Sequence, residues 1–355
     1  MMATPGAWIA GIGMMTAVGD CAAQTAASVR AGISRYRESS VYNRNFDPMT
    51  LALLPEEALP PLAEILEKVP GLTSRKLRML RLATPAFKEA TQPVLSGTPP
   101  PLFLAGAEPL ADRPPPVDDA FLDHLHTQVG GAFDRGTSAV FSSGRAGGFQ
   151  ALAAGLSALE RGAPFAVIGG VDTYLDLYLL GTLDLEGRVL AEGVMDGFCP
   201  GEGAGFLLLA SEAAAGGQRP GLATFVHLPF LAVELGHRYS EEPYKGEGLA
   251  NAVTGALPPL EGRPVRTVYG SLNGENFGAK EWGVSVLRNK AALAEGFHFE
   301  HPADCFGDTG AACGPLLLGL AAFGMSRGYR PGACLVWCSS ERELRGATCL
   351  ARRSS

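Results

Sequence analysis

Residues 196–208 read DGFCPGEGAGFLL, a glycine-rich turn that runs directly into an apolar segment ending at Ala210. Glycines permit a tight turn and a close approach of neighbouring backbone, so we expect Glu202 within this turn to be structural. The apolar run that follows predicts a buried strand at Gly201–Ala210.

Strands and helices alternate on the N-terminal side of this turn. Phe165–Val171 is an apolar strand that ends in Gly169-Gly170, and the Gly- and Ala-rich segment Ser142–Arg161 before it is helical. Glycine inside a helix costs about 1 kcal/mol relative to Ala, so Gly147-Gly148 predicts a close helix contact. The other elements expected here are strands at Trp8–Met14, Leu102–Ala105 and Ser138–Phe141 and helices at Cys21–Arg30, Ser74–Thr91 and Asp118–Arg135.

Two stretches of this half differ from the regular alternation. Residues 35–72 carry several prolines and predict an irregular excursion outside the core. The predicted helix Ser74–Thr91 carries four basic residues on one side, and we interpret them as a solvated helix face. These residues are Arg75, Lys76, Arg78 and Arg81.

The second half repeats the alternation after a turn-rich break at Ala214–Pro220. This break predicts a boundary between an N-terminal half, residues 1–215, and a C-terminal half, residues 220–355. Strands are expected at Leu222–Leu231, Val265–Ser271 and Cys334–Cys338, and helices at Gly246–Leu257, Ala279–Ala294 and Gly314–Arg327. This order predicts an α/β protein with mostly parallel sheets and a duplicated architecture.

Composition excludes several classes of protein. The chain has 355 residues, 46% of them hydrophobic, and a net charge of 29 − 36 = −7, so neither global disorder nor general nucleic-acid binding is expected. The longest apolar stretch, Gly314–Met325, is shorter than the roughly 20 residues that span a bilayer. No basic residue precedes the first apolar run, so we expect no signal peptide and a cytoplasmic protein. Seven cysteines without C-x-x-C spacing and six histidines predict no metal site, and we expect no cofactor.

Three segments carry a resemblance to a known family. They are Ala10–Gly19 (AGIGMMTAVG), Ala163–Asp172 (APFAVIGGVD) and Asp196–Leu208. Together they resemble the β-ketoacyl synthase (3-oxoacyl-carrier-protein synthase) family of the thiolase-like fold. The resemblance implies two duplicated βαβαβ-type halves, layers in the order α-β-α-β-α, and a tight homodimer or heterodimer.

The resemblance also locates three catalytic positions, and all three differ here. The family's nucleophilic cysteine falls at Gly144, or at Ser143 with one residue of slip. Its two histidines fall at Asn273 and Asp308, and its glycine-rich gating loop falls at the charged segment Trp337–Gly346, WCSSERELRG. The resemblance therefore implies vestigial site positions rather than working catalytic residues.

Arg145 begins the helix at which the acyl-cysteine would otherwise be reached. A buried arginine needs an anionic partner, because an unpaired buried charge costs several kcal/mol. We therefore predict that Arg145 and Asp308, together with Asn273, form a polar cluster that plugs the former active site. Glu275 and Glu281 near Asn273 have no diagnostic spacing, and we expect them to be solvated or hydrogen-bonded.

These differences favour a non-catalytic protein that resembles a β-ketoacyl synthase. Two roles stay open: a partner subunit of a thiolase-fold synthase, or an adaptor or chaperone, including one associated with a type VI secretion effector. Acyl-carrier protein is a further candidate partner, at the basic run Arg75–Arg81. The alternative is an active 3-oxoacyl-acyl-carrier-protein synthase or acyltransferase that uses Ser143 as its nucleophile. A serine needs an adjacent base, and the competing interpretation of Ser142 or Ser143 is a helix cap.

Overall fold

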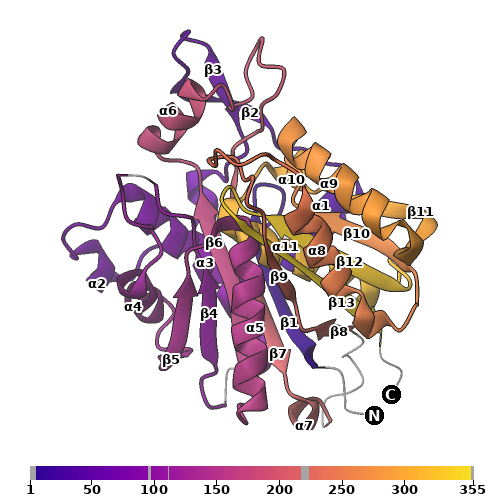
Figure 1. The fold of residues 1–355 in the computed structure, drawn as a ribbon. Helices are drawn as coiled ribbons and strands as arrows, with labels where there is room; N and C mark the ends of the chain where they lie inside the picture. The colour runs from indigo at the N-terminus through magenta and orange to yellow at the C-terminus, as the bar shows by residue number, and fades with distance from the viewer. Residues whose placement is uncertain (1–4, 95–96, 111, 217–223, 353–355) are drawn as a thin grey trace.

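The computed structural model describes residues 5–94, 97–110, 112–216 and 224–352. Eleven strands of this described part form one sheet (Figure 1). They are β1 (Gly6–Thr16), β4 (Pro101–Ala105), β5 (Asp134–Phe141), β6 (Phe165–Thr173), β7 (Glu202–Ala210), β8 (Thr224–His227), β9 (Phe230–Val233), β10 (Val265–Gly270), β11 (Leu293–Glu300), β12 (Ala333–Ser339) and β13 (Leu344–Arg352). The longer helices are α1 (Ala22–Arg30), α3 (Ser74–Thr91), α4 (Asp119–Gln128), α5 (Gly147–Glu160), α6 (Leu177–Leu185), α8 (Glu247–Ala256), α9 (Asn276–Asn289) and α11 (Cys313–Ser326).

The two halves of the sheet have the same strand order. The first half runs β5-β4-β6-β7-β1 and the second runs β11-β10-β12-β13-β8, with β9 paired to β13. Gly6–Trp8 at the start of β1 pairs with β8 and joins the halves into one sheet. The predicted duplication is therefore confirmed. The boundary at residues 214–220 stays a prediction, because 217–223 lie outside the described residues.

The sheet is mixed, so the expectation of mostly parallel sheets is wrong. Within the eleven-stranded sheet of the described residues, four strand pairs are parallel and six are antiparallel. The reason is that the last strand of each half, β7 or β13, returns antiparallel to the strand before it. Only the helix-connected strands β4, β5 and β6 and their counterparts β10, β11 and β12 pair in parallel.

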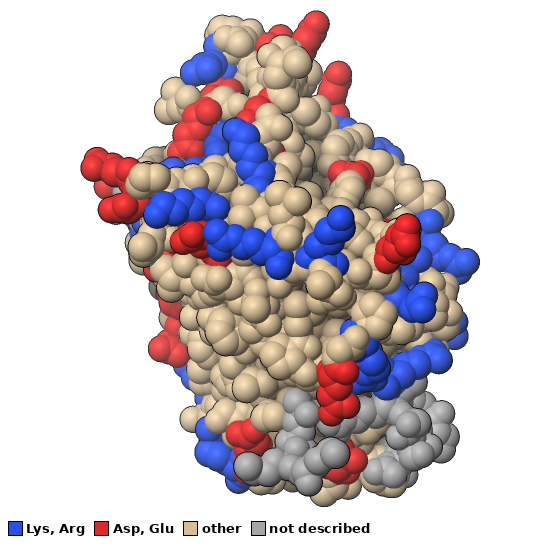
Figure 2. All heavy atoms as spheres, turned by 45° about the vertical axis from the view of Figure 1, so that its right-hand side comes forward, with Lys and Arg blue, Asp and Glu red and all other residues tan. Residues whose placement is uncertain are grey.

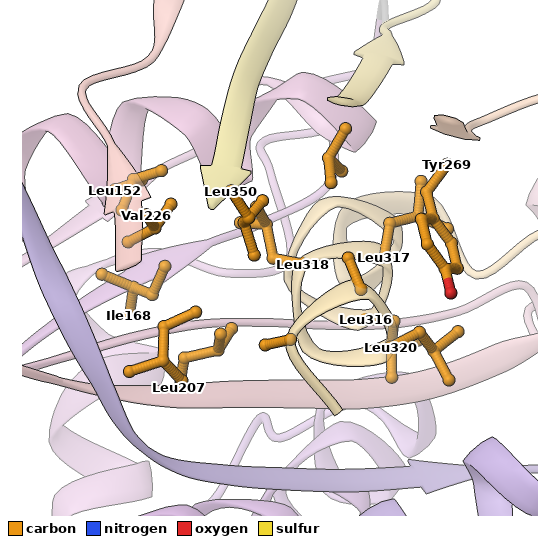
Figure 3. Close-up of a cluster of buried hydrophobic side chains, with 14 of the residues drawn as sticks. Leu152, Ile168, Leu207, Val226, Tyr269, Leu316, Leu317, Leu318, Leu320 and Leu350 are labelled. Carbon is orange, nitrogen blue, oxygen red and sulfur yellow. The ribbon is translucent and has the colours of Figure 1, made fainter. Parts of the chain in front are cut away.

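The three largest hydrophobic clusters of the described residues lie between the five layers. Helix α3 covers the outer face of β1, β6 and β7, helices α8 and α9 cover the outer face of the second half, and α5 and α11 lie between the halves. Adjacent residues of one strand serve different cores, since Val167 packs with α3 while Ile168 faces the central helices. Figure 3 shows this central core, where Ile168 and Leu207 approach Leu316 and Leu318 of α11. The predicted α-β-α-β-α layering is confirmed.

Several predicted boundaries shift. The helix expected at Asp118–Arg135 ends at Gln128, because Gly130 and Gly131 adopt positive φ and Asp134 already begins β5. The helix expected at Ala279–Ala294 spans Asn276–Asn289, and the strand β11 that follows it was missed.

Other segments gain structure that the sequence analysis did not assign. Within residues 35–72 the hairpin of β2 (Arg37–Tyr42) and β3 (Pro48–Leu51) is followed by the short helix α2 (Glu64–Glu67). The segment compared with a gating loop, 337–346, ends β12 and begins β13. Among the described residues, no helix has both the length and the apolar character needed to cross a membrane.

The basic side of α3 is not a solvated face. Its four basic side chains are only 10% to 20% exposed, and each is bound to a carboxylate. Arg75 pairs with Asp172, and Arg78 donates to Glu202, which is fully buried. Glu202 also accepts hydrogen bonds from the Leu54 amide and the Thr173 hydroxyl, so the predicted structural role of this residue fits its contacts. Helical periodicity alone cannot distinguish such buried ion pairs from a solvated face.

Glycines set how closely the layers approach. A Cβ at Gly13 of β1 would overlap the Ala86 carbonyl oxygen of α3. In the centre, a Cβ at Gly148 of α5 would lie 2.6 Å from Pro315 Cδ of α11. The predicted close helix contact at Gly147-Gly148 is therefore confirmed, and it brings the first turns of the two central helices together.

The packing under α3 gives a testable prediction. We expect Gly13→Ala to lower the free energy of unfolding by about 1–3 kcal/mol or more, because backbone must move to admit the Cβ. Gly283→Ala is the control, since Gly283 is exposed within α9 and a Cβ there meets nothing within 4 Å. That variant should gain about 0.5–1 kcal/mol in chemical denaturation. Equal stability of the two variants would contradict this packing.

Candidate functional site

The site forms where the two central helices begin. A 3-10 turn, Gly144–Ala146, precedes α5, and a second one, Gly310–Ala312, precedes α11. These turns occupy equivalent positions in the two halves and contact each other. Arg145 lies in the first turn, and Asp308 lies two residues before the second. The duplicated topology therefore brings a cation from one half against an anion from the other.

Arg145 and Asp308 form the contact that the sequence analysis predicts. Arg145 Nε lies 3.1 Å and 2.9 Å from the two Asp308 carboxylate oxygens, and Arg145 Nη2 also donates to Oδ2. Asn273 Nδ2 donates to the same Oδ2 at 2.8 Å. Both charged residues are buried, with 7% of Arg145 and 3% of Asp308 exposed. Burial of both partners makes this a paired interior charge rather than a surface ion pair.

Four more charged side chains extend this cluster. Arg145 Nη1 donates to Glu341 at 2.7 Å, and Arg188 donates to the same Glu341 oxygen at 2.9 Å. Arg188 also binds both oxygens of Glu275 at 2.7 Å and 2.8 Å, and Arg238 bridges Glu275 and Glu341. Three arginines therefore face three carboxylates in the charge cluster, which we define by these six residues and Asn273. Outside the charge cluster, Arg188 also pairs with the more exposed Glu186 at 3.3 Å.

The pKa values within the charge cluster reflect this balance. Burial by itself would lower the pKa of Arg145, but Asp308 and Glu341 raise it above its usual range. Burial likewise opposes the charge of Glu341, yet Arg145, Arg188 and Arg238 hold the pKa of that carboxyl well below its usual value. Both groups are therefore fully charged at neutral pH and are unsuited to proton transfer.

The position expected for a nucleophile has no side chain, and Glu108 packs against it. Gly144 adopts φ +65°, and a Cβ there would lie 3.0 Å from Glu108 Oε2. Glu108 accepts hydrogen bonds from the backbone amides of Glu341 and Arg342 at 3.1 Å and 3.0 Å. Burial raises the pKa of Glu108 to about 7, and the nearby charge of Glu341 adds to this shift. Glu108 thus joins the start of α5 to the turn between β12 and β13.

Ser143 has the position but not the environment of a nucleophile. Its carbonyl oxygen accepts from the Ser340 hydroxyl, and within the described residues no histidine hydrogen-bonds to its own hydroxyl. The expected helix cap is also wrong, because neither serine caps α5: the Ser142 hydroxyl donates to the Val117 carbonyl instead. The 3-10 turn that separates these serines from α5 explains the difference.

Sequence reasoning missed several members of the charge cluster. Arg188, Arg238 and Glu341 come from three separate loops, and the available signal was the charge of the segment 337–346. Glu275 joins the cluster, whereas Glu281 pairs with Arg345 in a separate and fully buried site. In the part of the chain that the structure describes, no group of three His, Cys, Asp or Glu side chains is arranged to hold a metal ion.

Comparisons with known proteins identify the fold. No protein-family model and no curated protein matches the chain. Solved structures do match, among them the ishigamide ketosynthase/chain length factor, at 14% identity over 99% of this chain and 100% of that one, with a TM-score of 0.77. The ketosynthase ApeO in complex with its chain length factor ApeC from Xenorhabdus doucetiae matches at 15% identity over 98% of each chain, with a TM-score of 0.75. A type II polyketide ketosynthase in complex with its acyl-carrier protein matches at 13% identity over 99% and 100%, with a TM-score of 0.77.

The chain therefore has the thiolase-like fold of β-ketoacyl synthases. Similarity to ketosynthase and chain length factor structures extends over the whole chain. At 13% to 15% identity this similarity defines the fold, and the charge cluster must be interpreted on its own chemistry.

The charge cluster gives a stability prediction. We expect Asp308→Asn to lower the free energy of unfolding by about 3–5 kcal/mol, because Arg145 loses its closest buried anion. Asp304→Asn is the matched control, since that carboxylate is largely exposed and should change stability by less than about 0.5 kcal/mol.

A double variant separates charge compensation from packing. Asp308→Asn combined with Arg145→Met removes both charges, so the double variant should be more stable than Asp308→Asn alone in urea denaturation. Additive losses in the double variant would show that Arg145 and Asp308 do not depend on each other.

Proposed function

We propose that this protein is a non-catalytic partner subunit of a thiolase-fold synthase in the cytoplasm. The observation that carries the proposal is the charge cluster at the tips of α5 and α11. Gly144, Asn273 and Asp308 stand where the family resemblance locates one cysteine and two histidines. Six charged side chains and an amide fill the space between them and satisfy one another.

Charge chemistry argues against a decarboxylating condensation at this site. Such a reaction needs hydrogen-bond donors at the oxygen on which negative charge develops. Asn273 is a donor, but its Nδ2 is already bound to Asp308 and Glu275. The negative charge of Asp308 would repel both a malonyl carboxylate and an enolate. Among the described residues the Ser143 hydroxyl is hydrogen-bonded to no histidine or carboxylate, so the alternative of a serine acyltransferase is not supported by the contacts of this residue.

The sheet offers a surface for the partner at the edge strand β5. Ala139, Val140 and Phe141 are apolar but only half-buried, and on one side of this strand no other strand of the described residues is paired. An open strand edge is a template for pairing with a second chain. Ser143 and Gly144 follow β5 directly, so a partner bound at this edge would lie beside the charge cluster. The ketosynthase and chain length factor complexes among the similar structures make a related thiolase-fold chain the favoured partner.

Acyl-carrier protein is a weaker candidate partner. The basic run on α3 is already bound to internal carboxylates, so it presents little free positive charge. Figure 2 shows Lys and Arg side chains mixed with Asp and Glu and separated by uncharged surface on the face it presents. No contact among the described residues favours an adaptor role toward a secretion effector. Recovery of such an effector with the purified chain would support that role.

Absence of acylation is the first prediction of this proposal. When the full chain is incubated with acyl-CoA and with acyl-carrier protein, intact mass should show no stoichiometric adduct. Ser143→Ala and the wild-type protein should behave identically, and an active ketosynthase treated in parallel is the positive control. A stoichiometric adduct that Ser143→Ala abolishes would overturn the proposal in favour of the acyltransferase.

The second prediction of this proposal concerns pairing with a partner subunit. Purified from its host, the chain should retain a thiolase-fold protein, and amides of residues 134–141 should exchange more slowly in the complex than in the free chain. The opposite edge strand, residues 293–300, is the internal control and should not change. Recovery of a secretion effector in place of a synthase would replace this proposal with the adaptor role, and a chain that binds neither would refute it.

A further inference from the structure

Two thiols lie in contact at the start of α11. The Sγ atoms of Cys313, the first residue of α11, and Cys338 of β12 are 4.0 Å apart. Cys338 is fully buried, whereas Cys313 is partly exposed and lines a small cavity that Asp308 also lines. Neither thiol belongs to the charge cluster. Two sulfur atoms at this separation are candidates for a covalent bond.

The packing around the two thiols favours that bond. A disulfide requires its sulfur atoms to approach to about 2.05 Å, so the gap to be closed here is about 2 Å. A Cβ at Gly314 would lie 3.8 Å from Cys338 Sγ, so this sulfur already lies against the first turn of α11. We therefore expect rotation of the two side chains, rather than movement of α11 or β12, to close the gap.

A second pair of buried cysteines, on neighbouring strands, has no such geometry. Cys334 of β12 lies opposite Leu350 of β13, and Cys349 is the residue next to Leu350. Adjacent residues of a strand point to opposite faces of the sheet. Accordingly, Cys334 belongs to the central hydrophobic cluster and Cys349 to the cluster under α8. The sheet therefore separates these two thiols, although their strands are paired.

Exposure determines which thiol of the contacting pair meets an oxidant. Reactive cysteines are partly exposed, and the thiolate is the form that attacks. Cys313 is partly exposed. Burial, together with the contact to Cys313, raises the pKa of Cys338 well above its usual value, so Cys338 stays protonated. Cys313 is therefore the thiol that an oxidant reaches, and Cys338 is the thiol placed to react with the product.

We propose that Cys313 and Cys338 form a reversible disulfide when the protein meets a peroxide. In the first step the Cys313 sulfur attacks a peroxide oxygen, the O–O bond breaks, and the departing hydroxide takes the thiol proton, which leaves a sulfenic acid and water. In the second step the Cys338 sulfur attacks the Cys313 sulfur, the S–O bond breaks, and hydroxide leaves with the Cys338 proton as water. Two thiols and one hydrogen peroxide thus give one disulfide and two waters.

The disulfide would join the two segments that carry anions of the charge cluster. Asp308 precedes Cys313 by five residues, and Glu341 follows Cys338 by three. A cross-link stabilises a fold by restricting the unfolded chain. Oxidation should therefore make the protein more resistant to unfolding and leave the charges of the cluster unchanged. This inference does not depend on the proposed partner role.

The test treats the native full chain with about one equivalent of hydrogen peroxide and then unfolds it in iodoacetamide. Untreated protein should be alkylated at all seven cysteines, because each of them is a free thiol. Treated protein should be alkylated at two fewer, and the tryptic peptides that contain Cys313 and Cys338 should be recovered as a linked pair. Dithiothreitol should separate the pair and restore full alkylation.

Four variants locate the bond. Cys313→Ala and Cys338→Ala should each prevent the linked pair. The matched controls are Cys305→Ala and Cys334→Ala, because Cys305 shares a tryptic peptide with Cys313, and Cys334 shares one with Cys338. Both controls should form the linked pair as the wild type does. Cys313→Ala carries the test if loss of the buried Cys338 thiol prevents folding, since Cys313 is partly exposed.

Each outcome decides the proposal. It would be refuted by native wild-type protein that forms no linked pair, or by a linked pair that Cys313→Ala still forms. A sulfinic acid on Cys313 without the linked pair would also refute it, because the two sulfurs would then not meet. In urea, treated wild type should unfold at a higher midpoint than reduced wild type, whereas treatment should not shift the midpoint of Cys313→Ala. Equal midpoints for the two wild-type forms would contradict a cross-link between α11 and β12.

Discussion

The buried pair of Arg145 and Asp308 is the interaction on which the centre of this protein depends. Each residue comes from the corresponding turn of a duplicated half, and neither charge would be tolerable there alone. Close packing of α5 on α11, permitted by Gly148, brings the two turns together. The pair therefore couples the two halves at the place where the first turns of α5 and α11 meet.

The helix termini explain why the centre needs negative charge. The positive ends of α5 and α11 both point toward the charge cluster. Asp308 accepts the Gly310 amide at 2.9 Å, and Asp172 accepts the Ala311 amide at 3.1 Å, so two carboxylates compensate the start of α11. According to the family resemblance, a thiolate would be stabilised at such a helix tip. In this protein the carboxylates of Asp308 and Asp172 supply the negative charge at the helix tip.

The sequence predicted those parts of the fold that local pattern determines. The apolar strands β1 and β6 and the central helices could be placed from the sequence, because the apolar residues along each of them follow a single pattern. The strands β11 and β13 could not be placed from the sequence, since charged residues, and aromatic ones in β11, interrupt their apolar pattern. Arg145 and Asp308 were recognisable because each stands within a motif of the resemblance. Arg188 and Arg238 were not recognisable from the sequence. Their contacts with Glu275 and Glu341 depend on how loops from both halves fold over the centre.

Charge balance also determines how strongly the charge cluster itself could bind an added ion. Within the charge cluster three cations meet three anions, so an added anion would gain little and an added cation would gain nothing. The arginines of the charge cluster are therefore neutralised by carboxylates of the chain itself, and the pairing of Arg145, Arg188 and Arg238 is satisfied without any added ligand.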